Sequence, residues 1–270
     1  MRSFVSLSVL TLLFSFPEGT ILADEWGNIK GRVVYGENKP FVPVELRVTK
    51  DRDHCLSKGK ILSEKYVVNP RNNGVRNVVV WVAAEQDGKA NHKAELRIHP
   101  SLKDIPADNK QVVIDSPCCR FEPHVVVLRK GQEIVGKNSA PIAHSMILNG
   151  PSGESYSTLL PPNHKIVLPA ERWKPHYLPV VVHCAIHTWM KAYVFVLGHP
   201  YSAVTDEDGN FEIKNVPAGK FRLMMWQEGV GWLLAEEGKH RSNGKGITVE
   251  AGKTLDVGKV PLMLAKEDRE

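Results

Sequence analysis

The sequence predicts an all-β protein that contains β-sandwich segments. Short stretches show apolar and polar residues in alternation, or β-branched residues in an unbroken run, as strands do. Clusters rich in Gly, Pro, Asn and Asp separate these stretches, for example GENKP (36–40) and NPRNNG (69–74). Between residues 29 and 98, no stretch keeps the 3.6-residue period of an amphipathic helix for three turns.

The N-terminus has the features of an export signal. Arg2 precedes an apolar run over residues 5–16, and Ala23 ends a plausible cleavage site before Asp24. We therefore expect residues 1–23 to be removed and the mature protein to be periplasmic or secreted. No later apolar run approaches the roughly 18 residues of a membrane-spanning helix, so we expect no membrane span.

Length and composition favour an ordinary globular protein. A chain of 270 residues has room for about two domains, and its hydrophobic content of 42% and charged content of 24% are typical of globular proteins. The net charge is only +5, and the Lys and Arg residues are scattered rather than clustered in a basic stripe. This distribution argues against nucleic acid as a partner.

The N-terminal segment, residues 24–104, is expected to be a β segment without an active site. His54 and Cys55 have no further donor at metal-ligand spacing, so a structural role is favoured for both. A linker rich in Pro and polar residues, PSLKDIPADNK, follows and marks a domain boundary. Strands are expected in this segment at residues 29–35, 42–48, 75–83 and 93–99.

The next segment, residues 105–199, has the spacing of strands in a β-sandwich. His124 precedes one of the strands, and we interpret it as a half-exposed strand residue rather than a ligand. Strands are expected at residues 111–115, 124–128, 133–137, 145–148, 165–168, 178–183 and 192–197.

One loop of this segment carries the pattern C-x-x-H-x-x-M. An apolar run at residues 180–182 leads to Cys184, His187 and Met190 follow, and a second apolar run leads the chain away. His144, in NSAPIAHSMIL, can supply a second imidazole. Two His, one Cys and a weak axial Met are the ligands of a blue-copper electron-transfer site.

These residues resemble the cupredoxin family, and the loop length is similar to that of amicyanin. The stretch CRFEPHVVVLRKGQEIVGKNSAPIAH also resembles the approach of that family to its first His. The resemblance spans residues 105–199. It implies a Greek-key β-sandwich, a redox partner protein, and one type 1 copper ion held by His144, Cys184, His187 and Met190. It also implies that His187 is the more exposed ligand and that the surrounding surface is the electron port.

Two positions depart from the family pattern. Ser145 stands where the family usually has Asn, and Thr188 stands where related loops often have Pro. Such neighbours of the ligands tune a metal more than they abolish its binding. They leave the reduction potential open.

Other interpretations of the loop remain open. Zinc could use Cys184, His183, His187 and His144, but adjacent residues on a strand point to opposite faces, so one ion can hardly bind both His183 and Cys184. The same ligands could serve a copper carrier or buffer. A non-redox surface protein with a vestigial metal site is a third alternative. An enzyme is not expected, because the other histidines are dispersed.

Four cysteines are present in a chain that we expect to be exported. If a metal binds Cys184, three remain in an oxidising compartment. Neighbouring cysteines rarely bridge to each other, so Cys118 and Cys119 are not expected to pair. We expect a disulfide between Cys55 and Cys119, which leaves Cys118 unpaired.

The last segment, residues 200–270, contains further strands and turns. The hairpin at Asp208-Gly209 and the stretch ITVEAGKTLDVGKVPLML resemble the carboxypeptidase regulatory-like β-sandwich domain, a non-catalytic module, over residues 200–263. The acidic triplet beginning at Asp206 lacks the remaining positions of a calcium loop, and a turn is favoured.

Overall fold

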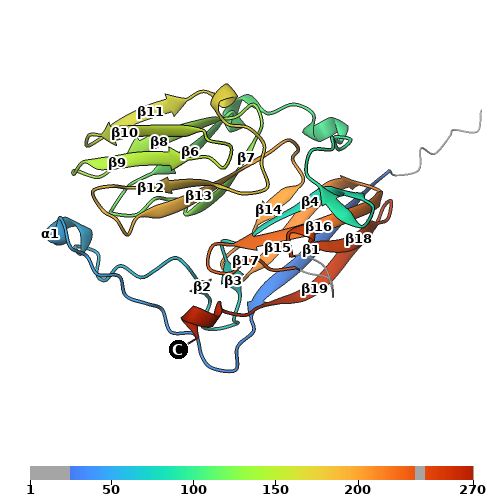
Figure 1. Ribbon diagram of the computed structural model, residues 1–270, viewed down its shortest axis with the longest axis horizontal. Helices are drawn as coiled ribbons and strands as arrows, with labels where there is room; N and C mark the ends of the chain where they lie inside the picture. Colours follow the sequence, from blue (N-terminus) through green and yellow to red (C-terminus); the bar gives the residue numbers. More distant parts are fainter. Residues whose placement is uncertain (1–24, 235–240, 270) are drawn as a thin grey trace, which may run out of the picture.

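The computed structural model describes residues 25–234 and 241–269, which form two β-sandwiches lying side by side (Figure 1). The expected export signal lies outside the described residues. The predicted all-β class is confirmed, because the helical segments of the described residues are short. They are α1 (Arg52–Cys55) and the 3₁₀ turns η1 (Pro100–Leu102), η2 (Ala107–Asn109), η3 (Ala170–Arg172), η4 (Arg241–Asn243) and η5 (Lys266–Asp268).

The middle of the chain forms the first sandwich. Its five-stranded sheet has the order β10-β9-β12-β13-β7, and its three-stranded sheet has the order β11-β8-β6. Strand β10 had no counterpart in the sequence prediction. The strands are β6 (Gln111–Asp115), β7 (Val125–Arg129), β8 (Glu133–Asn138), β9 (His144–Asn149), β10 (Ser155–Leu160), β11 (His164–Leu168), β12 (Val180–His183) and β13 (Lys191–Leu197).

The second sandwich combines strands from both ends of the chain. One sheet has the order β15-β1-β19 and the other the order β14-β4-β16-β17, with β5 paired to β4 and β18 paired to β16. The strands are β1 (Trp26–Tyr35), β4 (Val79–Gln86), β5 (Lys89–Asn91), β14 (Ser202–Val204), β15 (Asn210–Pro217), β16 (Gly219–Gln227), β17 (Gly231–Trp232), β18 (Lys245–Val249) and β19 (Thr254–Leu262). The short strands β2 (Val67–Val68) and β3 (Val75–Arg76) pair separately.

The N-terminal segment therefore differs from the expected organisation. Within the described residues it forms no sandwich of its own, because β1 lies between β15 and β19 and β4 lies between β14 and β16. Pairing partners so far apart in sequence leave no local signal in the chain. Strands β1, β4, β15 and β16, which come from both ends of the chain, share one core that includes Val33, Val82, Phe211 and Leu223.

Two of the expected strands are not formed. Residues 42–48 make only an isolated bridge from Glu45 to Leu62, and Val42 and Val44 are 76% and 63% exposed. Residues 95–99 are irregular, and the hairpin partner of β4 is β5 instead. The preference of a residue for strands depends on packing against neighbours, and Val42 and Val44 have little of it.

Strand β13 connects the two sandwiches, because both of its faces are buried. Val194 and Val196 point into the core of the first sandwich. Phe195 and Leu197 point the other way, into a second cluster that also contains Trp81 of β4. Successive side chains of a strand face opposite sides, so burial on both sides explains the unbroken apolar run.

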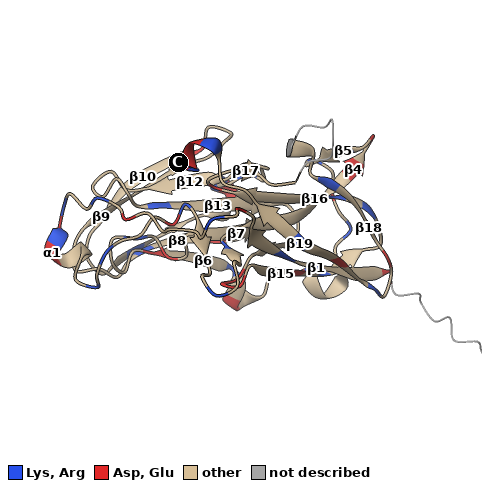
Figure 2. Ribbon diagram, turned by 90° about the horizontal axis from the view of Figure 1, so that it is seen from below, with Lys and Arg blue, Asp and Glu red and all other residues tan. Residues whose placement is uncertain are grey.

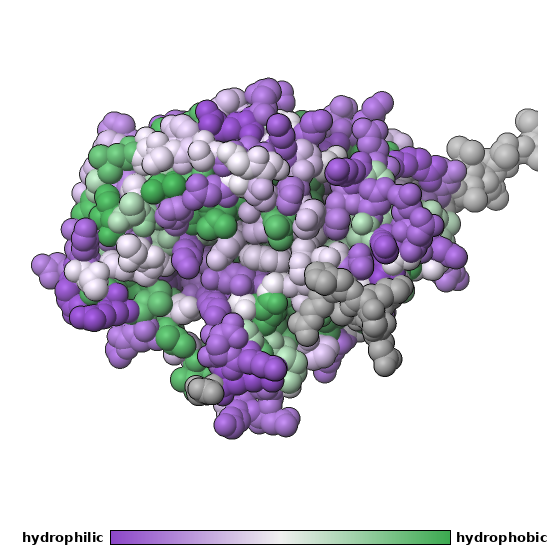
Figure 3. All heavy atoms as spheres, viewed as in Figure 1, coloured by the Kyte–Doolittle hydropathy of each residue, from purple (hydrophilic) through white to green (hydrophobic). Residues whose placement is uncertain are grey.

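The surface of the molecule is mixed in character. Figure 2 shows the positions of Lys and Arg intermixed with those of Asp and Glu along the ribbon of both sandwiches. The face in Figure 3 is largely hydrophilic, with smaller hydrophobic patches between. Among the described residues, no helix has the length and apolarity needed to cross a bilayer.

The turn at residues 206–210 shows how the acidic triplet is used. Asp206 Oδ1 accepts the backbone N–H groups of Asp208 (2.9 Å) and Asn210 (2.8 Å). Gly209 has φ +78°, and a Cβ there would lie 2.1 Å from the carbonyl oxygen of Val33. The carboxylate of Asp206 thus closes a turn that the sequence predicts.

Candidate metal centre

The residues of the C-x-x-H-x-x-M pattern lie at one end of the five-stranded sheet. His144 begins β9, Cys184 follows β12, and His187 and Met190 lie in the loop between β12 and β13. Strand β12 pairs antiparallel with both β9 and β13, so these strand ends meet. The pairing of His183 with Ile147 extends to a hydrogen bond from Ala185 N to Ser145 Oγ (2.7 Å).

Three potential ligand atoms converge at this point. The Nδ1 atoms of His144 and His187 are 3.0 Å apart, and Cys184 Sγ is 3.9 Å from His187 Nδ1. All three residues are buried, and their donor atoms lie within 4.8 Å of one another. Met190 is 2% exposed, and its backbone bonds to Cys184 N (3.4 Å) and His187 O (2.9 Å) hold it beside them.

The sulfur of Cys184 is surrounded by hydrogen-bond donors. The backbone N–H groups of Ser145 and His187 donate to Sγ, each at 3.4 Å, and the Ser145 hydroxyl lies 3.5 Å away. Such donors suit a sulfur that carries negative charge, which is the form that binds a metal. Ser145, the position that departs from the family pattern, therefore contacts the candidate ligand directly.

His144 is prepared as a neutral ligand. Burial, and then the neighbouring His187 and His54, lower the pKa of His144 to about 4. Its imidazole is consequently uncharged at neutral pH, as metal binding requires. Its Nδ1 faces His187, while its buried Nε2 has no hydrogen-bond partner in the part of the chain that the structure describes.

His187 was expected to be the more exposed of the ligands, and this expectation was wrong. Its side chain is 0% exposed, as is that of His144, so His187 is not an open port. The chain immediately before α1 lies against it, and Asp51 Oδ2 is 2.8 Å from His187 Nε2. The sequence could not show this contact, because Asp51 comes from a segment more than a hundred residues upstream.

The structure contains a disulfide between Cys55 and Cys119, residues 64 positions apart. The bridge anchors α1 beside the candidate metal centre, and both sulfurs lie within 4.8 Å of a ring nitrogen of His187. Trp189 Nε1 donates to the carbonyl of Cys119 at 3.2 Å, which ties the ligand loop to the same place. Cys118 is free, and its sulfur lies 3.8 Å from the carbonyl oxygen of His54.

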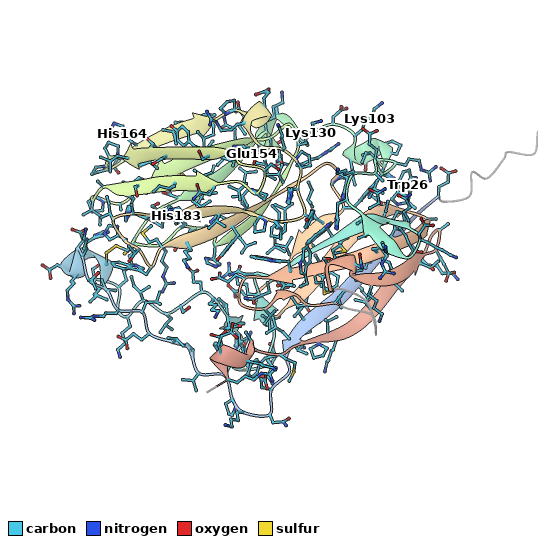
Figure 4. All side chains as sticks on the ribbon, viewed as in Figure 1. Trp26, Lys103, Lys130, Glu154, His164 and His183 are labelled. Atoms are coloured by element: carbon cyan, nitrogen blue, oxygen red, sulfur yellow. A yellow bond between two sulfur atoms is a disulfide. The ribbon has the colours of Figure 1, made fainter. Side chains whose placement is uncertain are left out.

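The remaining candidate histidines lie outside the cluster. His183 lies on β12 (Figure 4), and it does not belong to the group of facing donors found among the described residues. His124 is 7% exposed, so its interpretation as a half-exposed residue was wrong. It contacts the carboxylates of Glu228 and Glu64 instead. These acidic partners come from distant segments and left no sequence signal.

The donor set fits a copper ion of the type 1 kind. Two imidazole nitrogens and one thiolate form a compact trigonal set, and a thioether residue follows in the same loop. Asp51 is the neighbour that sequence reasoning missed. Its one signal in the sequence is that it lies four residues before Cys55, and the expected bridge from Cys55 to Cys119 ties this segment to the first sandwich.

Comparisons with known proteins give limited matches. The model of polysaccharide lyase family 4, domain II, matches residues 187–257, which is well short of half the chain. The matching family is therefore not the carboxypeptidase regulatory-like domain that was expected over residues 200–263. No curated protein matches the chain.

Solved structures of copper proteins are also similar to this chain. A reduced amicyanin mutant is 18% identical, covering 33% of this chain and 83% of its own, with TM-score 0.29. A copper-containing nitrite reductase from Thermus scotoductus SA-01 is 20% identical, covering 39% and 28%, with TM-score 0.30. A purple cupredoxin from Nitrosopumilus maritimus is 14% identical, covering 32% and 97%, with TM-score 0.26. Such values are too low to transfer a function, so the site must be judged from its own geometry.

Proposed function

We propose that this protein is an exported, cupredoxin-like protein that binds one type 1 copper ion and transfers electrons to or from a partner protein. The observation that carries the proposal is the convergence of His144 Nδ1, His187 Nδ1 and Cys184 Sγ in a buried site beside Met190. A copper ion bound there would supply a one-electron couple. Export is supported by the N-terminal sequence and by the Cys55–Cys119 bridge, which suits an oxidising compartment.

The protein's own residues would hold the ligand geometry nearly constant. His144 is fixed by its place on β9, and the sulfur of Cys184 is fixed by the N–H groups of Ser145 and His187. Burial of both imidazoles excludes water from the site. Ligands that move little between two oxidation states favour electron transfer with small reorganisation.

The same burial argues against an enzyme. The four ligand residues are 0–2% exposed, so a substrate has no direct approach to the ion. Electron transfer needs no such approach. The absence of His183 from the described donor group favours copper with methionine over the tetrahedral zinc set.

The proposal is tested by the visible spectrum and metal content of the mature protein. Copper bound to the Cys184 thiolate should give an intense blue colour in the Cu(II) state, and Cys184→Ser should abolish it. Cys118→Ser is the matched control, because Cys118 is a free thiol outside the donor group. A colourless wild-type protein loaded with Cu(II), or a blue Cys184→Ser variant, would refute the proposal.

Electrochemistry separates electron transfer from copper storage. Reversible oxidation and reduction with a reproducible midpoint potential is expected for an electron-transfer protein. A carrier or buffer should instead deliver its copper to an acceptor protein. Rapid delivery without reversible cycling would favour the carrier.

A further inference from the structure

The segment just before α1 covers one of the candidate ligands. Asp51 has φ 47° and ψ 40°, a left-handed conformation that few residues other than Gly adopt and that Asp tolerates better than most. The chain turns here into α1, where Cys55 N donates to Asp51 O at 2.8 Å. Cys55 is in turn fixed to Cys119. Asp51 is thus held in place by the backbone hydrogen bond to Cys55 and by the disulfide that fixes Cys55.

The contact between Asp51 and His187 defines the state of the imidazole ring. Asp51 Oδ2 lies 2.8 Å from His187 Nε2, and an ionised carboxylate can only accept a hydrogen bond. In the neutral ring, an Nε2–H that donates to this carboxylate leaves Nδ1 with a free electron pair. That Nδ1 is the atom that faces His144 Nδ1 at 3.0 Å and Cys184 Sγ at 3.9 Å.

We propose that Asp51 is a positioning residue of the metal centre: it fixes the ring orientation and tautomer of His187 and places a negative charge beside the metal. This inference rests on the proposed function. Partners of this kind, which hydrogen-bond the second nitrogen of a ligating His, change metal affinity about 10- to 100-fold when removed. The negative charge stabilises Cu(II) more than Cu(I), because Cu(II) carries the larger positive charge.

The chain offers a matched control. Asp53 lies two residues away on α1, is exposed and is of the same type, but among the described residues no hydrogen bond or ion pair joins its carboxylate to His187. Asp51→Ala removes both the acceptor and the charge, whereas Asp51→Asn removes the charge and keeps an acceptor oxygen. Asp51→Glu tests rescue. Because the Asp51 side chain is 44% exposed, these variants should fold, which thermal melting checks.

The expected results concern affinity and potential. Asp51→Ala should lower the affinity for Cu(II) about 10- to 100-fold in a chelator competition. A tenfold loss confined to Cu(II) raises the midpoint potential by about 59 mV. Asp51→Asn should give a smaller change in the same direction, Asp51→Glu should recover part of it, and Asp53→Asn should match wild type.

A second readout needs no copper. In the metal-free protein, ¹⁵N chemical shifts of the imidazoles should show the proton of His187 on Nε2, and Asp51→Ala should give a mixture of tautomers. The inference is overturned if wild-type His187 carries its proton on Nδ1, or if Asp51→Ala and Asp53→Asn bind Cu(II) equally well. A wild-type protein that binds no copper but shows the Nε2 proton would refute the proposed function alone.

Discussion

At the scale of single residues, the buried amide of Asn138 holds together the loop that leads to His144 in the candidate metal centre. Its Nδ2 lies within hydrogen-bond distance of the carbonyl oxygens of Ile142 (2.8 Å), Leu160 (2.9 Å) and Pro161 (3.0 Å). Its Oδ1 accepts the N–H of Ala140 at 3.0 Å. Asn138 therefore joins the loop that leads to His144 to the end of β10, and it is itself 0% exposed.

Asn138→Ala should destabilise the fold by roughly 1–3 kcal/mol, because it leaves buried backbone groups without partners. Urea unfolding of the metal-free protein measures this free energy. Asn149→Ala is the control, since Asn149 is exposed at the far end of β9, and its effect should stay within about 0.5 kcal/mol. Equal stability of the two variants would show that the amide of Asn138 has no such role.

At the scale of the elements, the disulfide between Cys55 and Cys119 connects α1 to the first sandwich. This bridge holds the segment that covers His187, in which Cys55 N donates to Asp51 O at 2.8 Å. The bridge also closes a long loop, with a sequence separation of 64. Closing a loop of this length restricts the unfolded chain and so favours the folded state.

The double substitution of Cys55 and Cys119 by Ala should lower the free energy of unfolding by roughly 3–5 kcal/mol. If the protein binds copper as proposed, the double substitution should also speed the loss of copper to a chelator, because α1 is no longer anchored over His187. Cys118→Ala should leave both quantities unchanged, since Cys118 is free. Peptide mapping without reduction should recover Cys55 linked to Cys119. A free Cys55 in protein from its native compartment would contradict the bridge.

At the scale of the whole molecule, His124 joins three parts of the chain. Its ring, next to β7, contacts Glu228 after β16 and lies 3.6 Å from Glu64 of the N-terminal segment. Burial alone would lower the pKa of His124, but the carboxylates of Glu228 and Glu64 outweigh burial and raise it. Burial also raises the pKa of Glu64, while His124 and Arg120 oppose that shift.

These shifts predict how stability depends on pH. A group whose pKa is higher in the folded state binds its proton more tightly there, so its contribution is complete below the unfolded value, about 6.5 for His. The contribution is lost as pH rises through the folded pKa of His124. Unfolding free energies should therefore fall as pH rises above about 6.5 in wild type, and fall less in His124→Gln. His164→Gln, at an exposed site, should keep the wild-type profile; a similar profile for His124→Gln would reject the idea.

The sequence by itself determined the features that depend on neighbouring residues. Alternating and β-branched runs predict the strands of the first sandwich other than β10, because the period of two is a local property of a strand. Cys184, His187 and Met190 follow one another closely between two predicted strands, so the sequence alone places them in one loop. The need for a second imidazole, together with the resemblance to cupredoxins, pointed to His144, and the structure brings its Nδ1 to 3.0 Å from that of His187.

Only the tertiary structure decided the features that depend on distant pairing. Strand β1 lies between β15 and β19, and Asp51 reaches His187 across 136 positions. Neither could be read from the chain, because a strand or a carboxylate carries no mark of its distant partner. The burial of His187, expected to be the more exposed ligand, and of His124, expected to be half-exposed, has the same explanation. The segments that cover a residue decide its burial, and for both residues those segments come from elsewhere in the sequence.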